Sequence, residues 1–370
     1  MLLAACGSAP AATPASSAAV SPSASALAKP AGSAASPVSS ASAKPAASAS
    51  SAASAAAKPA GSAAASPAAS GLTKLRFRYP VQTGAWIPFM IAKDQNVFQK
   101  YGLDVDVQLL QSTLMVPAII NGEMDVAGTS AETVIASYAK GIPLNIIGSM
   151  IPETVGYLVV SPDIKTVEDL KGQVVVLTGF GNVAEFALRR ILAMHNLEFG
   201  KDVQVRGVGN QAAEIAALAG GTAKGFMAYP PDDILAARAA PGAHSIFDVQ
   251  SLKLPYIQAS IFTKKDYIQS NKPTLVKFIQ ATSEAISIEK KNHDLAVQTF
   301  MKYAKLDDKE AADHAVTFYA DVAPPVPGVN SDGVKNVMEV VQATTPEAAN
   351  LDPKSVIDTS ITDQVKQASA

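Results

Sequence analysis

The chain has 370 residues with 30 basic and 32 acidic side chains, so its net charge of −2 is small for its length. A nucleic-acid-binding protein concentrates basic side chains on one face, and this balance does not indicate such a face. The single cysteine excludes an internal disulfide, and no segment approaches the roughly 20 apolar residues of a membrane-spanning helix. The folded part must therefore be stabilised by its hydrophobic core.

The single cysteine, Cys6, follows Leu3-Ala4-Ala5 and precedes Gly7, an arrangement that resembles a bacterial lipobox. Each buried acyl CH₂ contributes roughly 0.8 kcal/mol, so two or more acyl chains hold a protein on a bilayer. We predict that Cys6 is lipidated and that this lipid is the only membrane attachment. The rest of the chain then lies outside the cytoplasm, in the periplasm or on the outer face of the cytoplasmic membrane. The alternative is an apolar thiol in a disordered tail.

Residues 1–6 are interpreted as the end of a signal sequence. A secretory signal has a basic region and an apolar stretch of about 7–15 residues, and too few residues precede Cys6 for either. We therefore expect the true start of the protein to lie upstream.

Residues 7 to about 72 form a low-complexity tether rich in Ala, Ser and Pro. The segment AKPAGS at 28–33 recurs in part at 43–46 and in full at 57–62. We expect this tether to be disordered, because prolines interrupt every alanine run and no large apolar residue recurs to form a core.

From residue 73 onward, strand and helix patterns alternate. Leu75 to Tyr79 alternates apolar and polar residues as a strand does, and apolar residues at helical spacing predict a helix from Ile87 to Tyr101 that ends at Gly102. The pattern continues with strand 105–109, helix 116–121, strand 126–129, helix 132–140 and strand 144–147. Such alternation predicts a mainly parallel sheet covered by helices.

A second part of the chain repeats this arrangement. Strand 174–177 precedes a helix at 182–195, and strands 203–208 and 225–228 each lead into a helical segment. From Thr274 onward the sequence is almost wholly helical, and we expect these helices to pack on the first α/β part.

Two stretches 99 positions apart read alike, AIINGEMDVA at 118–127 and ALAGGTAKGF at 217–226. In each stretch a helix ends at a glycine, a strand follows, and the strand leads into another helix. If the likeness is not coincidental, the two parts share one topology and present equivalent strand ends. Ligands of α/β proteins bind at the carboxyl ends of strands, where helix N-termini offer free N–H groups.

Three motifs resemble a known family. Residues 92–105 (AKDQNVFQKYGLDV), 121–126 (NGEMDV) and 166–172 (TVEDLKG) are similar to segments of the solute-binding proteins of nitrate/sulfonate/taurine-type ABC importers. Pyrimidine- and riboflavin-binding proteins belong to the same family. One departure is Asn96 where the family usually has glycine, and asparagine tolerates the same left-handed turn.

The resemblance implies an α/β, two-lobed type II periplasmic-binding-protein fold with mainly parallel sheets and a C-terminal helical segment. It places lobe 1 at 73–161 and 257–370, lobe 2 at 162–256, and crossover strands at 156–160 and 257–262. It also implies a small-molecule solute, an ABC permease with its ATPase as partners, a monomeric state, and no cofactor or metal.

Candidate ligand-binding residues of lobe 1 follow its strands: Thr83, Gly84, Trp86, Gln111, Ser112, Ser130 and Glu132. Trp86 either stacks on a ligand or fixes its helix to the lobe. Ser112 either supplies a hydroxyl to the ligand or caps a helix. Ser130 and Glu132 either cap and charge the next helix or, through Glu132, accept a hydrogen bond from a ligand N–H or amine.

Candidate residues of lobe 2 are Thr178, Gly179, Phe180, Gly181, Asn182 and Tyr229. The glycine-rich turn at 178–182 opens a helix and offers backbone N–H groups to an anion or a carbonyl. No arginine or lysine falls in these loops. Aromatic residues there favour a planar or aromatic solute, whereas nitrate, sulfonate or taurine-type anions remain the alternative.

An enzyme on the same fold is the competing function. The four histidines, at 195, 244, 293 and 314, are scattered and lack metal-ligand spacing, and Cys6 lies in the tail. Neither a nucleophile motif nor a phosphate-binding loop is present. The sequence therefore favours a non-catalytic binding protein that serves either an importer or a sensor.

Overall fold

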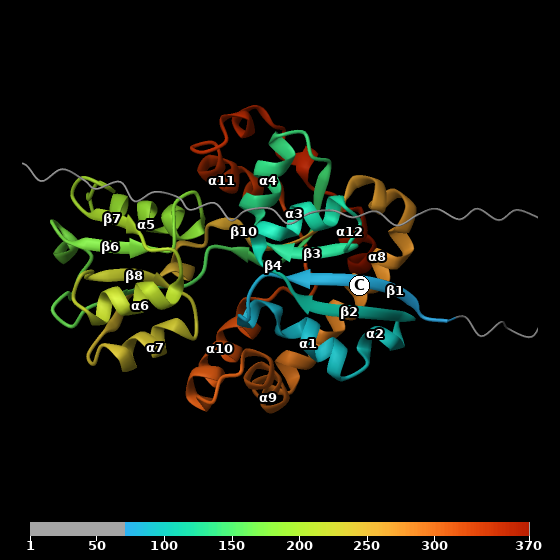
Figure 1. Ribbon diagram of the computed structural model, residues 1–370, viewed down its shortest axis with the longest axis horizontal. Coiled ribbons are helices and arrows are strands. Elements are labelled where there is room, and N and C mark those ends of the chain that lie inside the picture. The colour runs from blue at the N-terminus through green and yellow to red at the C-terminus, as the bar shows by residue number, and fades with distance from the viewer. Residues whose placement is uncertain (1–70, 370) are drawn as a thin grey trace, which may run out of the picture. The chain divides into compact units, whose positions relative to one another are not determined.

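The computed structural model describes residues 71–369 (Figure 1). The predicted signal at 1–6, the lipidation of Cys6 and nearly all of the tether lie outside the described residues. Within the described part of the chain, no helix has both the length and the apolar character needed to cross a membrane.

Five strands form the first sheet in the order β2-β1-β3-β10-β4. They are β1 (Thr73–Tyr79), β2 (Leu103–Leu109), β3 (Val126–Thr129), β4 (Leu144–Glu153) and β10 (Pro255–Lys264). β1 pairs in parallel with β2 and β3, whereas β10 runs antiparallel to β3 and β4.

Five further strands form the second sheet in the order β7-β6-β8-β5-β9. They are β5 (Tyr157–Val160), β6 (Val174–Leu177), β7 (Gln204–Gly207), β8 (Gly225–Ala228) and β9 (His244–Asp248). β6 pairs in parallel with β7 and β8, and β5 is antiparallel to β8 and β9.

The two sheets share one topology, which accounts for the repeated stretches at 118–127 and 217–226. β3 and β8, the strands of these stretches, occupy the same third place in their sheets. As expected, the sheets are mainly parallel, because four of the five strands of each run in one direction. In each of them the fourth strand, β10 or β5, enters directly from the other half of the molecule and therefore runs against its neighbours.

Residues 154–156 and 249–254 carry the chain between the sheets. The Thr154 N–H donates to the carbonyl oxygen of Leu254 (3.0 Å), and the Val249 N–H donates to that of Gly156 (2.9 Å), so the two passages are paired. β5 pairs only within the second sheet, so the first passage lies a few residues before the predicted boundary at 161. The apolar residues of β5 predict a buried strand, but they do not indicate which of the two sheets the strand joins.

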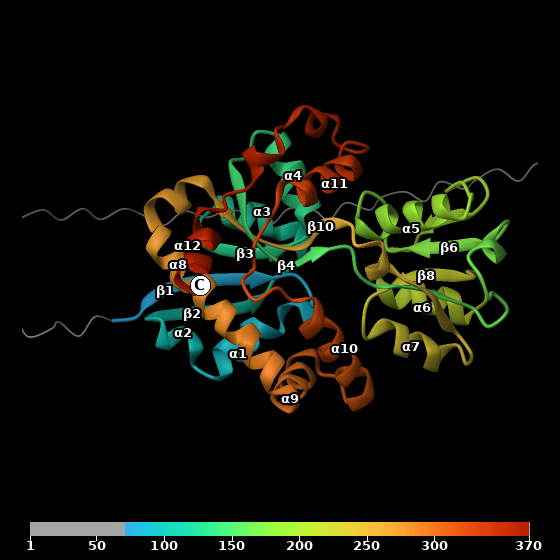
Figure 2. The same ribbon diagram turned by 180° about the vertical axis from the view of Figure 1, so that it is seen from behind.

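Helices cover both sheets (Figures 1 and 2). In the first half they are α1 (Ile87–Asp94), α2 (Val97–Lys100), α3 (Ser112–Ile120) and α4 (Ala131–Ala139), and in the second α5 (Val183–Met194), α6 (Gln211–Ala219) and α7 (Asp232–Ala239). The C-terminal part holds α8 (Lys265–Lys291), α9 (His293–Ala304), α10 (Lys309–Val322), α11 (Ser331–Val341) and α12 (Ser360–Ser369). Short 3-10 helices span Gly84–Trp86, Glu168–Leu170, Val249–Leu252, Pro346–Asn350 and Pro353–Val356.

The single helix expected at 87–101 is divided at Asn96. Asn96 has φ 55°, a left-handed conformation that ends α1 and directs α2 along a new axis. Gly102 follows with φ 75° and ends α2 before β2. The expectation that asparagine takes the left-handed position here is confirmed.

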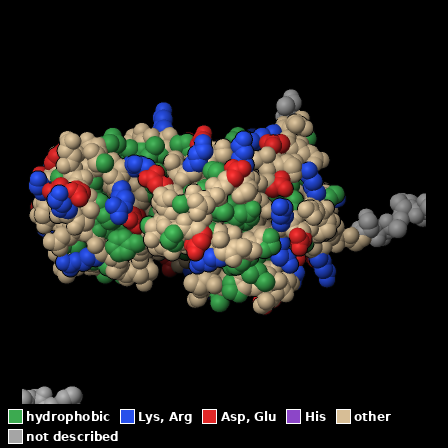
Figure 3. Space-filling view, turned by 90° about the horizontal axis from the view of Figure 1, so that it is seen from above, with side chains coloured by type: hydrophobic (Ala, Val, Ile, Leu, Met, Phe, Trp, Pro, Cys, Tyr) green, Lys and Arg blue, Asp and Glu red, His purple; other side chains and the backbone are tan. Residues whose placement is uncertain are grey.

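The C-terminal helices pack on the first lobe, as the sequence predicted. α8 lies against α1 and α12, and α11 lies against α4 and β10. The centre of this core is a group of stacked rings. The ring centroids of Phe77 and Phe89 are 4.3 Å apart, and those of Phe89 and Phe278 are 5.7 Å apart. Figure 3 shows acidic and basic side chains interspersed on the face it presents.

Candidate functional site

A cavity of about 340 Å³ lies where the carboxyl ends of the strands of both sheets meet. Thr129 ends β3 and Ile151 lies near the end of β4, while Thr178 and Tyr229 directly follow β6 and β8. Carboxyl ends of parallel strands are the usual ligand-binding edge of α/β proteins. The cavity is therefore the candidate functional site.

Six of the residues singled out from the sequence line this cavity: Thr83, Trp86, Ser112 and Ser130 from the first lobe, and Thr178 and Tyr229 from the second. They come together because the loops after β1, β2, β3, β6 and β8 all open toward the same space. Ser130 lies at the start of α4, where its hydroxyl is 3.3 Å from that of Thr133.

The other seven singled-out residues do not line the cavity: Gly84, Gln111, Glu132, Gly179, Phe180, Gly181 and Asn182. Asn182 caps α5, since its side-chain oxygen accepts from the Glu185 N–H (3.1 Å) and its amide donates to the Gly179 carbonyl (3.1 Å). The Phe180 ring is 55% exposed, lies beside Gly207 and does not line the cavity. The tight turn at 178–182 directs the ring away from the cavity.

Glu132 is buried behind the wall of the cavity. The Tyr256 hydroxyl donates to its Oε1 (2.9 Å), and its Oε2 has no hydrogen-bond partner among the described residues. Burial raises the pKa of Glu132 above its usual value, although hydrogen bonds from Tyr256 and the backbone oppose the shift. Its side chain therefore connects α4 to β10 and does not line the cavity.

Trp86 is only 2% exposed and packs against the rings of Phe77, Tyr79 and Phe89, with centroids 6.0–6.5 Å apart. The ring therefore fixes the start of α1 to the lobe while also forming part of the cavity wall. Gly128 of β3 makes this possible, because a Cβ there would overlap the indole.

Gly128→Ala is expected to destabilise the protein by about 1–3 kcal/mol, because the added methyl group forces the indole out of its packed position. Urea unfolding followed by tryptophan emission measures this directly. Gly179→Ala is the matched control, since a Cβ there meets nothing within 4 Å, and it should change stability by less than about 0.5 kcal/mol. Equal effects of the two changes would contradict this account of Trp86.

The cavity also contains residues that the sequence did not single out, among them Thr129, Gln211, Asp232, Gln258 and Tyr319. Gln211 and Asp232 are the first residues of α6 and α7, so their places after β7 and β8 could have identified them. Tyr319 comes from α10, and nothing local in the sequence indicates that this helix reaches the cavity.

Residues 84–294, more than half of the chain, match the family described as NMT1/THI5 like. The chain belongs to this family. The resemblance drawn from residues 92–105, 121–126 and 166–172 is thereby confirmed.

The "Putative binding protein YtlA" of Bacillus subtilis (strain 168) is 26% identical over 222 residues, which are 58% of this chain and 65% of YtlA. The periplasmic aliphatic sulphonate binding protein SsuA of Escherichia coli has a TM-score of 0.64 at 20% identity over 77% of this chain and 92% of SsuA. The periplasmic nitrate-binding protein NrtA of Synechocystis PCC 6803 has a TM-score of 0.62 at 16% identity over 80% of this chain and 89% of NrtA. These similarities identify the fold as the two-lobed periplasmic-binding-protein fold.

In this NMT1/THI5-like protein the described carboxyl groups beside the cavity include Asp232, which lines it, and Glu214, which is buried next to Asp232. Burial, and secondarily the charge of Asp233, raises the pKa of Asp232 to about 6. Burial and the neighbouring Asp232 raise the pKa of Glu214 to about 8, although the Thr178 backbone N–H opposes this shift. No lysine, arginine or histidine is among the described residues that line the cavity.

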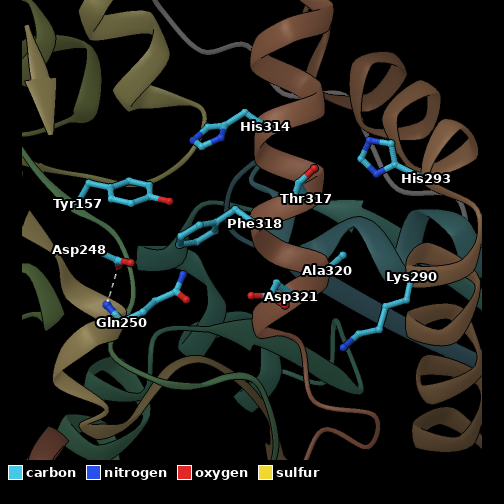
Figure 4. Close-up of a pocket in the computed structure, with 10 residues that line it drawn as sticks. All are labelled: Tyr157, Asp248, Gln250, Lys290, His293, His314, Thr317, Phe318, Ala320 and Asp321. Atoms are coloured by element: carbon cyan, nitrogen blue, oxygen red, sulfur yellow. Dashed lines mark hydrogen bonds between the residues drawn. The ribbon is translucent and has the colours of Figure 1, made fainter.

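A larger groove of about 570 Å³ lies beside the second passage between the lobes (Figure 4). The rings of Tyr157 and Phe318 are 5.6 Å apart at its floor, and Tyr157 stacks 6.1 Å from His314. Exposed charged side chains such as Asp248 and Asp321 border it. Among the described strands the groove touches the carboxyl end of β9 alone, at Asp248, so it is the weaker candidate for a ligand site.

Polar contacts connect the lobes on both sides of the cavity. His314 Nε2 of α10 is 2.7 Å from Asp233 Oδ2 of α7, and Arg238 of α7 pairs with Asp308. On the other side Arg190 NH2 of α5 lies 2.6 Å from Glu339 Oε2 of α11. These pairs hold the two lobes around the cavity in the described arrangement.

Proposed function

We propose that this protein is the extracytoplasmic solute-binding component of an ABC importer. It closes its lobes on a small organic solute and delivers the solute to a permease driven by an ATPase. The observation that carries the proposal is the cavity between the carboxyl ends of both sheets, lined by hydroxyl, amide and aromatic groups from both lobes. A receptor of this kind needs no catalytic group, and the relatives named above are binding proteins by name.

The walls of the cavity favour a planar organic solute. Trp86, Tyr229 and Tyr319 provide aromatic surface, while Thr83, Ser112, Ser130 and Thr178 provide hydroxyl groups. About 340 Å³ falls at the lower end of the roughly 300–1,000 Å³ of small-molecule sites. One substituted ring fits such a volume, and sulfonates or nitrate remain the competing class.

Binding is coupled to lobe closure in this proposal. A solute that contacts Ser130 of one lobe and Thr178 of the other interacts better with the closed form, so it shifts the open–closed equilibrium. The paired passages at 154–156 and 249–254 are the proposed hinge. Gly156 takes φ 118°, and a Cβ there would lie 2.7 Å from the Ala228 carbonyl oxygen, so the hinge requires glycine.

The location and assembly form part of the same proposal. A lipid on Cys6 would anchor the tether at the membrane, and the binding domain would act as a monomer at the outer face or in the periplasm. A tether of this length lets the domain reach the permease without leaving the membrane surface.

A thermal-shift screen of the full chain tests the proposal. The panel contains nitrate, alkylsulfonates, taurine, pyrimidines, flavins and aromatic acids and amines. A solute present at about 100 times its dissociation constant adds about 2.7 kcal/mol of stability, and emission of the single tryptophan reports the same event at the cavity wall.

Thr178→Phe fills the cavity and is expected to abolish the shift produced by any hit. Thr317→Phe is the matched control, because Thr317 lines the groove of Figure 4 instead and its replacement should leave the shift unchanged. The absence of any hit, or loss of binding in Thr317→Phe alone, would contradict the proposed site.

A further inference from the structure

Several buried polar atoms around the cavity have no partner within the described part of the chain. Thr129 is 1% exposed, lines the cavity, and its Oγ1 makes no hydrogen bond. Two further buried atoms have no hydrogen-bond partner among the described residues. They are the hydroxyl of Tyr229, which also lines the cavity, and Oε2 of Glu214. Buried polar atoms in folded proteins are nearly always paired, so these three indicate a group that the protein itself does not supply.

Glu214 and Asp232 place two carboxyl groups at this wall. Glu214 is 1% exposed and lies one helical turn after Gln211, which lines the cavity, so Glu214 is buried just behind this wall, next to the Thr178 backbone and Asp232. Asp232 lines the cavity from the first turn of α7. The Thr178 backbone N–H is the one hydrogen-bond partner of the Glu214 carboxyl, and its Oε2 has none among the described residues. Burying a carboxylate that is only partly paired is costly, and a cation offsets this cost most directly.

Helix N-termini at the same wall would favour an anion, and this effect must be weighed against the carboxyl groups. The partial positive charge at a helix N-terminus is roughly half an elementary charge. It stabilises a nearby negative charge by about 0.3–1 kcal/mol. The first turns of α4, α6 and α7 already contain Glu132, Glu214 and Asp232 with Asp233. These carboxyl groups occupy the helix ends that an anion would need, and the Asp232 carboxyl, whose pKa is about 6, is ionised at pH 7.

Resting on the proposed function, we propose that the solute carries a positively charged nitrogen, an amidinium, guanidinium or ammonium group, which binds between Asp232, Glu214 and the Tyr229 hydroxyl. On the first lobe, the Thr129 hydroxyl accepts a hydrogen bond from a second N–H of the solute. A planar amidinium on an aromatic ring also matches the aromatic wall formed by Trp86 and Tyr229.

Proton release follows from the same arrangement. Burial raises the pKa of Glu214 to about 8, so in the empty protein this carboxyl holds a proton at pH 7. The ionisable groups that face it are Asp232 on α7 and the Tyr229 hydroxyl, with Glu132, Asp233 and Tyr319 around them. A bound cation favours the carboxylate, so the Glu214 proton passes to solvent as the complex forms.

Three probes of nearly the same shape test the inference: benzamidine, benzamide and benzoate. Isothermal titration calorimetry of the full chain at pH 7 is expected to give at least tenfold tighter binding for benzamidine than for benzamide, and no binding for benzoate. Repeating the benzamidine titration in buffers of different ionisation enthalpy should reveal release of a proton.

Glu214→Gln is expected to weaken benzamidine binding at least tenfold, to affect benzamide binding far less and to remove the proton release. Asp232→Asn provides a second variant with the same expected selectivity. Glu289→Gln is the matched control, since Glu289 is an equally buried acid of α8 that does not line the cavity, and it should leave all three affinities unchanged. A thermal melt establishes that each variant is folded.

Tight binding of benzoate that Thr178→Phe abolishes would overturn the inference and leave the proposed function standing. Absence of benzamidine binding, or equal binding of benzamidine and benzamide, would also overturn it. The proposed function is tested separately, because it fails if the wider solute panel gives no thermal shift.

Discussion

At pH 8, replacing Glu289 with glutamine is expected to raise the free energy of unfolding by roughly 3–4 kcal/mol. Glu289 lies in α8 at 1% exposure, and neither of its carboxyl oxygens has a hydrogen-bond partner among the described residues. Burial raises its pKa from 4.5 to about 8, with a small opposing effect of Lys290. Each pKa unit corresponds to about 1.4 kcal/mol of difference between the two protonation states.

The pH dependence follows from the sign of this shift. Between 4.5 and about 8 the folded state holds a proton at Glu289 that the unfolded chain has lost, so stability falls as the pH rises through this window. Glutamine carries no such penalty. The variant and the native protein should therefore differ little at pH 5 and most at pH 8, in urea unfolding at both pH values.

Exposed Glu347→Gln serves as the control for the loss of a carboxylate and should change stability by less than about 0.5 kcal/mol at both pH values. If Glu289→Gln instead destabilises the protein at pH 8, Glu289 has a partner that stabilises its charged form.

Trp86→Ala is expected to destabilise the protein by about 3–5 kcal/mol, the usual cost of removing a large buried aromatic side chain. The indole packs against three core rings, and its removal leaves a cavity between β1, β3 and α1. Solute binding by this variant would be weakened partly through loss of order in the wall. Denaturant unfolding measures the stability change.

Trp86→Phe separates the two roles of this residue. It keeps an aromatic ring in the core and should cost less than half as much stability as Trp86→Ala. It still removes the outer part of the indole from the cavity wall, so a weaker solute affinity in this variant would assign Trp86 a direct contact. Little loss of stability in Trp86→Ala would contradict the packing described here.

The sequence predicted the elements that depend on local pattern. Strands 126–129, 174–177 and 225–228 have the bounds expected, because each is a short apolar run bounded by turn residues. Asn96 was expected to take a left-handed turn and does so, although the sequence did not show that this turn would divide the helix. The common topology of the two lobes followed from the stretches at 118–127 and 217–226.

Features that depend on tertiary packing were not predicted. Phe180 was expected to face the solute, but the turn at 178–182 directs its ring toward Gly207. Glu214 sits on an ordinary helical face in the sequence, and its burial beside Asp232 arises only when α6 and α7 pack together. Tyr319 reaches the cavity from α10, a helix far along the chain.

A crystal structure of the protein with the tightest-binding solute of the panel tests the central claim most directly. The account predicts that the solute lies between Ser130 of the first lobe and Thr178 of the second, in contact with Tyr229 and Asp232. A solute found in the groove beside Tyr157 and His314, or held by one lobe alone, would contradict it.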